Sequence, residues 1–505
     1  MRNLAISIAL SVLGFCTGGC SHLVETPYSN ITTASFFKSQ QDAEAAVVGI
    51  YSTMHHGTWW YTDNAQAVLY PGMYSLARAY TQLITYQIDY SYTPLNSLWT
   101  GHYTAINQCN AVLKYVPGVD MDEVRKNQLL AEARWLRAYL YFDLVRLFGD
   151  VPLKMEPTES ESQINLPRTS YKDIYNKLII PDLEFAEQNL PMTGSNGRIG
   201  RGAAPFLLGK VYLTMAGKPM NDVNQLTKAK EKLEDVINNQ SGYGYALMPR
   251  YIDVFPLTAD LTGFDGSKEL NKELIFVIQQ AQTPDIQGSA MAYAYTPLQS
   301  LFVNVGTGGS HQLGYMQELY DLYEPGDERR DINLIHDYAW RNNPSLRRVF
   351  GKDAPYNNVN WGMCQRKYID PDQVQATNGD PDIIIYRLAD AYLMLAEVDN
   401  ELTGPDEAVF DNLDMIRRRA KASPVNRTVA WTQQMVRDTL YNERIKELNF
   451  EFHDVYDLRR LGLVAKSFQM NPQRKAFSYD PKFELYPIPQ IEMERNPLCT
   501  QNPGW

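Results

Sequence analysis

Cysteine and histidine are scarce in this sequence, which argues against metal-centred and disulfide-stabilised sites. Of the 505 residues, five are cysteine and seven are histidine. Beyond the N-terminal region the thiols are those of Cys109, Cys364 and Cys499, and three thiols cannot form a full disulfide framework. The chain also has no C-x-x-C pair or Cys/His cluster that would indicate zinc. We therefore expect no metal ligands and no cofactor.

Common catalytic motifs are missing as well. The sequence contains no H-E-x-x-H, no G-x-S-x-G and no phosphate-binding loop, and residues 197–202 read G-x-x-G-x-G, which is not the dinucleotide pattern. Glu443 and Glu447 form a carboxylate pair, but glycoside hydrolysis needs two carboxyls facing each other across a cleft, roughly 5–10 Å apart. These two would share one face of a helix. We therefore predict that the protein is not an enzyme.

No apolar run reaches the ~20 residues that a membrane-spanning helix needs. The apolar residues 4–15 follow Arg2 and fit the core of a secretory signal. They lead into Gly18-Gly19-Cys20, and small residues directly before a cysteine are typical of a lipoprotein signal, although Thr17 stands where leucine is usual. We predict a signal peptide over 1–19, acylation of Cys20 and a lipidated tether over 20–32, with an ordinary signal peptide as the alternative. Two acyl chains would anchor the protein stably, at about 0.8 kcal/mol per buried CH₂.

Positive charge is not in excess, which argues against a nucleic-acid partner. There are 47 Lys and Arg residues against 58 Asp and Glu, a net charge of -11, whereas nucleic acid is bound by a basic face. Aromatic residues are plentiful instead, at 12% of the chain with 33 tyrosines. Flat rings stack on sugar faces, so this composition favours carbohydrate contact in an exported acidic protein, although most rings serve the core.

Helical periodicity is clearest over residues 128–148. Apolar residues from Leu129 to Leu147 recur there at steps of three and four, which predicts a helix that Gly149 ends. Further helices are predicted at about 40–56, 98–115, 170–190, 201–216, 226–239, 383–402, 406–421, 432–451 and 454–463. Between them lie the non-periodic stretches 57–97, 241–315 and 325–380. Loops this long are uncommon in compact domains and usually functional.

Several segments, in order along the chain, resemble the SusD/RagB family of Bacteroidetes outer-membrane nutrient-binding lipoproteins. The most specific are AEARWLRAY (131–139), FDLV (142–145), GDVPL (149–153) and the C-terminal YPIP (486–489) with QNPG (501–504). The others are SFFK (35–38), DAEAA (42–46), GIY (49–51), Trp99 with Tyr103, Ile106 and Asn110, GR (197–198), GAA (202–204), KVYL (210–213), YRLAD (386–390), LM (393–394), AE (396–397), IR (416–417), RA (419–420), ER (443–444), EL (447–448), Glu451, DLRR (457–460) and NP (496–497).

The resemblance implies an all-α fold in which about four tetratricopeptide-like helix pairs form a scaffold and long irregular loops carry the ligand site. It implies a single domain over 33–505, with the C-terminal signature region at about 380–505. It further implies a non-catalytic lipoprotein of the outer membrane that faces the cell exterior, captures glycans and delivers them to a SusC-like TonB-dependent transporter. The alternative is a helical-repeat surface protein that binds peptides or proteins.

Ligand-binding positions vary within that family, so our candidates rest on the residues themselves. Aromatic and polar side chains in the long loops are the expected binders, because a ring stacks on a sugar while Asp, Asn or Arg bonds its hydroxyls. For each ring the alternative is packing inside the loops, and Trp99 is assigned to the scaffold. The candidates are Trp59, Trp60, Tyr61, Asp63, Asn64, Arg78, Tyr80, Tyr293, Tyr295, Trp340 and Trp361.

Charged residues on the apolar 128–148 helix need partners, since half-buried guanidinium groups require carboxylates. This helix carries Arg134, Arg137, Asp143 and Arg146. We predict ion pairs to the C-terminal helices that fix how the helices pack. The available carboxylates there are those of Asp390, Glu397, Glu443, Glu447, Glu451 and Asp457.

Overall fold

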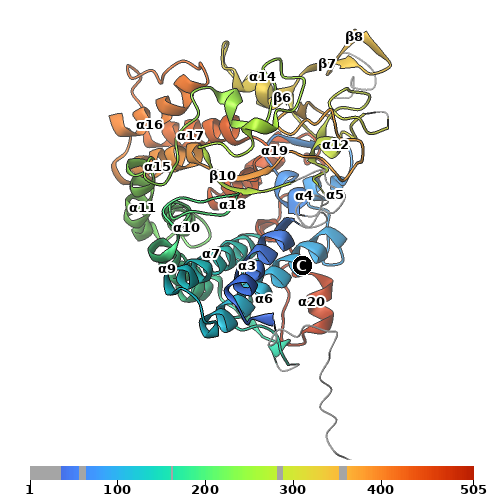
Figure 1. Ribbon diagram of the computed structural model, residues 1–505. Helices are drawn as coiled ribbons and strands as arrows, with labels where there is room; N and C mark the ends of the chain where they lie inside the picture. Colours follow the sequence, from blue (N-terminus) through green and yellow to red (C-terminus); the bar gives the residue numbers. More distant parts are fainter. Residues whose placement is uncertain (1–35, 56–63, 161–162, 281–287, 307, 352–360) are drawn as a thin grey trace, which may run out of the picture.

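The computed structural model describes residues 36–55, 64–160, 163–280, 288–306, 308–351 and 361–505. Helices dominate this part of the chain. In Figure 1 the longer helices occupy the left and lower parts of the molecule, and the short strands and irregular segments gather towards the upper right. The fold therefore separates a helical side from a side built of loops.

Neighbouring helices form the scaffold. Helix α3 packs on α6, α6 on α7, α7 on α9, α9 on α10, α10 on α11, α11 on α15, and α15 on both α16 and α17. Their bounds are α3 (Gln40–His55), α6 (Thr93–Tyr115), α7 (Glu123–Phe148), α9 (Ile180–Asn189), α10 (Ala203–Ala216), α11 (Leu226–Asn238), α15 (Leu388–Thr403), α16 (Glu407–Arg419), α17 (Gln433–Leu448) and α18 (Asp454–Arg460).

Helix α7 is the longest of these helices, with 26 residues, and local chemistry sets its ends. Asp122 caps the N-terminus by accepting the Arg125 backbone N–H at 2.8 Å. Gly149 ends the helix with φ +74°, a conformation that favours glycine. Trp135 and Tyr139 stack on each other and pack against Phe276 of strand β4. The helix thus joins the helical side to the loop side.

Shorter elements complete the fold. The short helices are α4 (Asn64–Leu69), α5 (Thr81–Thr85), α8 (Tyr171–Ile174), α12 (Met291–Tyr295), α13 (Gln317–Asp321), α14 (Arg329–Asn333), α19 (Val464–Met470) and α20 (Gln490–Arg495). Antiparallel pairs of strands form β1–β5 (Ser75–Ala77 with Leu313–Tyr315), β2–β3 (Val151–Pro152 with Arg168–Thr169), β4–β10 (Leu274–Ile278 with Ile383–Arg387), β6–β9 (Leu334–Ile335 with Cys364–Gln365) and β7–β8 (Asp337–Trp340 with Asn343–Val349).

Most predicted helices are confirmed, and two expectations need correction. Residues 383–387 were predicted to begin a helix, but they form strand β10, because a fully buried run starting with three isoleucines pairs with β4. The fold is mostly helical, with a few short strands. Helix α6 begins earlier than predicted, at Thr93, because Pro94 suits its first turn. The grouping into four tetratricopeptide-like pairs stays a prediction.

The arginines of α7 form ion pairs, as predicted, but their carboxylate partners are not the predicted ones on the C-terminal helices. Arg134 and Arg137 both pair with Asp182 of α9, at 3.0 and 2.8 Å. Arg146 pairs with Asp143 of its own helix. The reason is that α9 packs directly on α7, so its carboxylate reaches these guanidinium groups.

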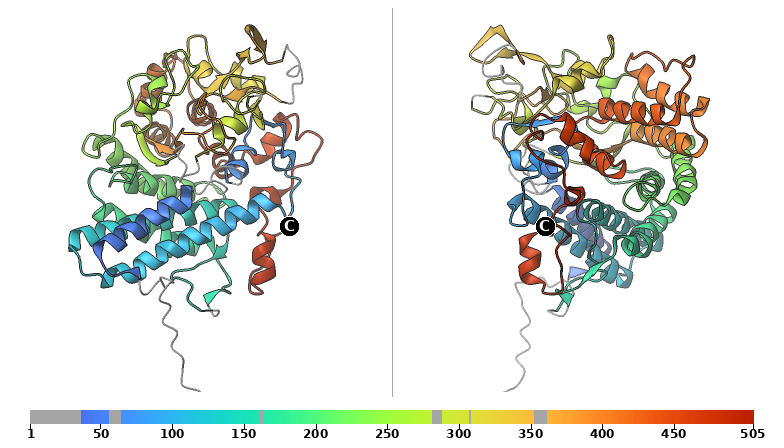
Figure 2. Two further views of the ribbon diagram at one scale, coloured as in Figure 1. Left: turned by 45° about the vertical axis from the view of Figure 1, so that its right-hand side comes forward. Right: turned by 180° about the vertical axis from the view of Figure 1, so that it is seen from behind.

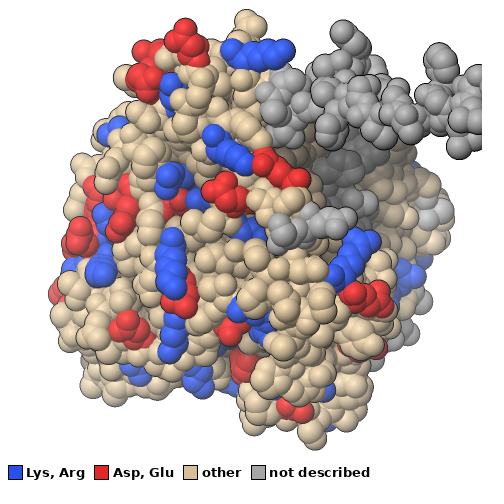
Figure 3. Space-filling view, turned by 90° about the horizontal axis from the view of Figure 1, so that it is seen from below, with Lys and Arg blue, Asp and Glu red and all other residues tan. Residues whose placement is uncertain are grey.

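Two hydrophobic cores support the molecule. The larger contains side chains from Ala43 to Cys499, and Trp99 lies in it as predicted. The smaller lies among the loops, around Tyr251, Phe255 and Tyr338. On the face seen from below, lysine and arginine side chains are interspersed with acidic ones (Figure 3). Within the described ranges, no helix is both long and apolar enough to cross a bilayer.

Candidate functional site

The three long non-periodic stretches meet on the loop side. Within the second stretch, the chain from 293 to 312 folds back on itself: Ser310 N–H donates to the Tyr293 carbonyl at 2.7 Å, and Gln312 N–H donates to the Ala294 carbonyl at 2.8 Å. It then enters β5, which pairs with β1 of the first stretch. The third stretch joins through Met363, whose backbone exchanges two hydrogen bonds with Tyr315.

Trp361 and Arg78 lie together at this junction. The Arg78 guanidinium is 5.2 Å from the centroid of the Trp361 ring and donates to the Ser310 carbonyl at 2.8 Å. Close backbone approach makes this contact possible: a Cβ on Gly314 would lie 2.0 Å from the Trp361 carbonyl oxygen. A half-buried indole beside an exposed cation is therefore held in place by a rigid backbone.

Tyr80 follows Arg78 by two residues in the chain, and 43% of its surface is exposed. Its backbone is left-handed, with φ +55°, and it precedes α5. A non-glycine residue in this region is uncommon and costs about 1 kcal/mol. The Tyr80 ring lies edge-on to the fully buried ring of Tyr70, with centroids 6.4 Å apart. This contact holds the exposed ring in a defined orientation.

The two tyrosines of α12 separate into one partly exposed and one buried residue. Tyr293 is half-buried, and its carbonyl fixes the loop through Ser310. Tyr295 is fully buried, packing against Phe450 at 5.0 Å and Tyr70 at 6.4 Å. The prediction that Tyr295 binds ligand is therefore wrong, because the Tyr295 ring belongs to the core. Tyr293 and Tyr295 are two residues apart in one helical turn, so their side chains point in different directions.

Trp340 ends strand β7 in the third non-periodic stretch. Its indole N–H donates to the Gln299 side chain at 2.6 Å. Arg348 of the paired strand β8 covers its ring at 4.2 Å. Trp340 is half-buried, so one part of the ring is held by the hairpin and another remains open.

We call these five residues (Arg78, Tyr80, Tyr293, Trp340 and Trp361) the aromatic face. The elements around them, α4, α5, α12 and the β7–β8 hairpin, lie on one side of the molecule, away from α11 and α16 (Figures 1 and 2). The other candidates, Trp59, Trp60, Tyr61 and Asp63, lie outside the described residues, as does Cys20. Asn64 begins α4, directly beside that undescribed stretch.

Sequence analysis missed the residues that hold this face in place. Gln299, Ser310 and His311 each bond a candidate residue. The His311 Nε2 lies 2.9 Å from the Trp361 carbonyl. Burial lowers the pKa of His311 to about 4, so its ring is neutral at neutral pH. These roles depend on how separate loops meet, which neither periodicity nor a motif signals.

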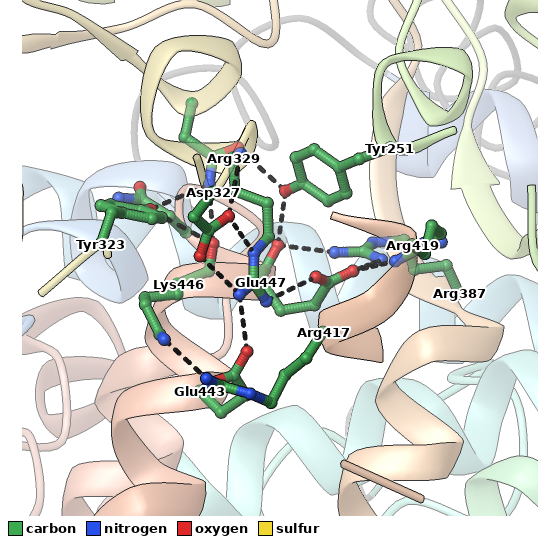
Figure 4. Close-up of polar contacts among 12 residues, drawn as sticks. Tyr251, Tyr323, Asp327, Arg329, Arg387, Arg417, Arg419, Glu443, Lys446 and Glu447 are labelled. Carbon is green, nitrogen blue, oxygen red and sulfur yellow. Dashed lines mark hydrogen bonds and ion pairs between the residues drawn. The ribbon is translucent and has the colours of Figure 1, made fainter. Parts of the chain in front are cut away.

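The acidic pair considered for catalysis belongs to a buried network that we call the α17 ionic cluster (Figure 4). Glu443 pairs with Arg329, Arg417 and Lys446, at 2.7, 2.7 and 2.9 Å. Glu447 pairs with Arg329, Arg387 and Arg419. The cluster also includes Glu273, Asp327 and Glu451.

The carboxylates of Glu443 and Glu447 have a structural role in buried ion pairs. Both glutamates are almost completely buried and share the same helix face, as predicted. Burial alone would raise the pKa of Glu447, but Arg419, Arg387 and Arg329 lower it to about 2. A group held ionised in this way cannot act as a general acid near neutral pH. Among the described residues, no three His, Cys, Asp or Glu side chains are arranged to hold a metal ion.

Comparison with known proteins agrees with this architecture. The sequence model described as "SusD family" matches residues 272–505, and one described as "Starch-binding associating with outer membrane" matches residues 22–213. The SusD-like protein P2 of Formosa agariphila is 26% identical, over 99% of each chain.

Solved structures share the fold. One, titled "Laminarin binding SusD-like protein", is 25% identical with a TM-score of 0.75, covering 93% of this chain and 100% of that one. Surface glycan-binding protein A from Bacteroides fluxus is 22% identical with a TM-score of 0.71, at the same coverage. Two such family models match successive parts of the sequence and SusD-like relatives align along nearly all of it, so the chain is similar to the SusD/RagB family over most of its length.

Proposed function

We propose that the protein is a non-catalytic glycan-binding protein and that the aromatic face is its binding site. The observation that carries this proposal is the pairing of Trp361 with Arg78. A half-buried indole offers an apolar surface to the C–H face of a sugar, while the adjacent guanidinium can donate hydrogen bonds to hydroxyl oxygens. Tyr80 adds an exposed ring held in a fixed backbone conformation.

The charge of Arg78 is available to a ligand. Within the described ranges, Arg78 has no carboxylate within ion-pair distance, so its donors are not already neutralised by one. The solved laminarin-binding relative provides independent support, since it shares the fold at 25% identity. Surface sites of this kind bury little area, and we expect affinities in about the micromolar to millimolar range.

The sequence and the family resemblance support a proposal for how the protein is attached to the membrane and which transporter it serves. We propose that Cys20 is acylated, that residues 20–32 tether one folded domain over 33–505 to the outer membrane, and that this domain faces the cell exterior. It would then deliver glycan to a SusC-like TonB-dependent transporter. Affinity purification from outer membranes tests the partnership: a co-purifying transporter of that type supports it, and its absence after mild crosslinking contradicts it.

Trp361→Ala tests the binding site. Titration calorimetry with laminarin and with soluble starch should show at least one binding the parent, and the substitution should weaken that binding on the order of tenfold. The matched control is Trp431→Ala, because Trp431 is also half-buried but packs against Phe410 beside α16, away from the aromatic face.

Two outcomes would overturn this site. Glycan affinity could be unchanged in Trp361→Ala, or equally reduced in both variants. If no glycan on a broad array binds the parent while a peptide library does, the protein binds peptides instead and the proposed function is wrong.

A further inference from the structure

A cavity lies on the helical side, outside the aromatic face. Its volume is about 430 Å³, within the ~300–1,000 Å³ range of small-molecule pockets. The ends of α7 and α10, helix α18 and the C-terminal segment around 479–485 form its walls. Four tyrosines line it: Tyr171, Tyr175, Tyr456 and Tyr479.

The cavity is lined by more positive than negative groups. Arg146, Lys218, Arg459 and Arg460 contribute to its wall, against one acid, Glu484. Two of the arginines are already neutralised: Arg146 pairs with Asp143, and Arg460 pairs with Glu397 and Asp457. The Glu484 carboxylate accepts the Tyr479 hydroxyl at 2.7 Å.

Arg459 differs from the other two arginines. It is 7% exposed, and no carboxylate of the described residues lies within ion-pair distance of it. Its Nη1 donates to the carbonyls of Arg146 and Leu147, at 3.0 and 3.4 Å, and so caps the C-terminus of α7. Its guanidinium also lies over the Tyr486 ring at 4.6 Å.

The other edge of this guanidinium has no partner. Buried Nε and Nη2 make no hydrogen bond to any residue that the structure describes. These two nitrogens form the edge that holds a carboxylate or similar oxyanion through two parallel bonds. Leaving a buried charged donor unsatisfied is costly, so this edge favours an anion.

Lys218 adds a second cation at the cavity. It is exposed and forms no ion pair among the described residues. Its backbone N–H donates to the Arg460 carbonyl at 2.8 Å, which ties the end of α10 to α18. Lys218 and Arg459 both line the cavity, so an anion inside it would meet two cations.

We propose that this cavity binds a small organic oxyanion, a carboxylate- or sulfate-bearing molecule of about monosaccharide size. Arg459 and Lys218 hold the acidic group, and the tyrosines pack against the body of the ligand. This site is distinct from the aromatic face in position and in chemistry, since there the guanidinium stacks on an indole and here it offers an unpaired edge. It does not depend on the proposed glycan function.

Titration calorimetry on the protein, at constant ionic strength, tests this site with sodium glucuronate, sodium sulfate and uncharged glucose as probes. Glucuronate should bind with 1:1 stoichiometry and raise the unfolding temperature, and glucose should do neither. Binding of glucuronate alone identifies a carboxylate with a ring body as the preferred ligand. Binding of both anions identifies a general oxyanion site.

Substitutions locate the binding. Arg459→Gln should weaken glucuronate binding on the order of tenfold or more, because it removes a charge-assisted pair of hydrogen bonds. Lys218→Ala should weaken binding severalfold without affecting folding, since its side chain is exposed. The matched control is Lys172→Ala, an exposed lysine next to Tyr171 that does not line the cavity. Trp361→Ala should also leave glucuronate binding unchanged.

The proposal is overturned if neither anion binds at concentrations on the order of 10 mM. Equal binding of glucose and glucuronate would also overturn it. So would glucuronate affinity that is unchanged in both Lys218→Ala and a folded Arg459→Gln protein, because the ligand would then lie elsewhere.

Discussion

In the α17 ionic cluster Arg387 meets three carboxylates, those of Glu273, Glu447 and Glu451, at 2.6–2.8 Å, and all four side chains are fully buried. On the aromatic face Arg78 is exposed, lies against an indole and pairs with no carboxylate of the described chain. The same residue type thus holds helices and loops together in one region and remains available to a ligand in the other.

The difference shows what burial requires of charge. A guanidinium removed from water is stable only when carboxylates and hydrogen bonds replace its hydration, so the cluster is saturated internally. Near the surface, water hydrates the guanidinium, so an exposed cation does not need a carboxylate partner. The family-like motifs of the C-terminal helices therefore mark structure, and the aromatic face has to be sought outside them.

We expect the largest loss in the free energy of unfolding from a substitution that breaks the α17 ionic cluster. Glu447→Ala leaves Arg329, Arg387 and Arg419 short of one carboxylate in a buried site, and we expect a loss of about 3–5 kcal/mol in the free energy of unfolding. Urea unfolding followed by tryptophan fluorescence measures this. Glycan affinity of the fraction that remains folded should be unchanged. A loss below about 1 kcal/mol would show that the cluster is not what fixes the packing.

A second prediction concerns how the free energy of unfolding changes at acidic pH. Two buried carboxylates of the cluster, Glu443 and Glu447, have pKa values below their ordinary ones. For Glu443, burial raises the pKa, but Arg329, Lys446 and Arg417 outweigh it and lower the pKa. A lowered folded-state pKa contributes stability that is complete above the unfolded-state value and is lost as pH falls towards the folded one. Unfolding free energy should therefore drop steeply below about pH 4.5.

Unfolding midpoints measured from pH 7 to pH 3 check this acid dependence. The Glu447→Ala protein serves as the comparison, because it lacks one of the groups with a lowered pKa and should show a shallower decline. A parent protein whose stability is the same at pH 5 and pH 3 would contradict the assignment of these carboxylates as ionised and paired.

Sequence alone predicted the scaffold well, because helix signals are local. The apolar stripe and Gly149 define α7 from its own residues. At Ile383–Arg387 local reasoning failed, since a short run of three isoleucines and a tyrosine fits a strand or a buried helix, and only pairing with β4 decides between them.

Contacts between residues far apart in the sequence could not be predicted from the sequence. The partner of Arg137 proved to be Asp182, and no local pattern distinguishes it from the carboxylates of the C-terminal helices. On the aromatic face, loop composition selected Arg78 and Trp361 as candidates. Their contact, however, depends on close backbone approach at Gly314, which is a property of the assembled loops.

The smallest effect is expected from an exposed ion pair beside the aromatic face. Arg347 of β8 pairs with Asp337 of β7, and the two side chains are 61% and 42% exposed. Water already solvates both groups, so Arg347→Ala should change the free energy of unfolding by no more than about 0.5 kcal/mol. Urea unfolding under the conditions used for Glu447→Ala makes the two values directly comparable. Glu447 is buried and pairs with three arginines, whereas Arg347 is exposed and pairs with one carboxylate. If Arg347→Ala cost as much as Glu447→Ala, burial would not be what separates the two regions, and an arginine on the loop side could not be considered available to a ligand merely because it is exposed.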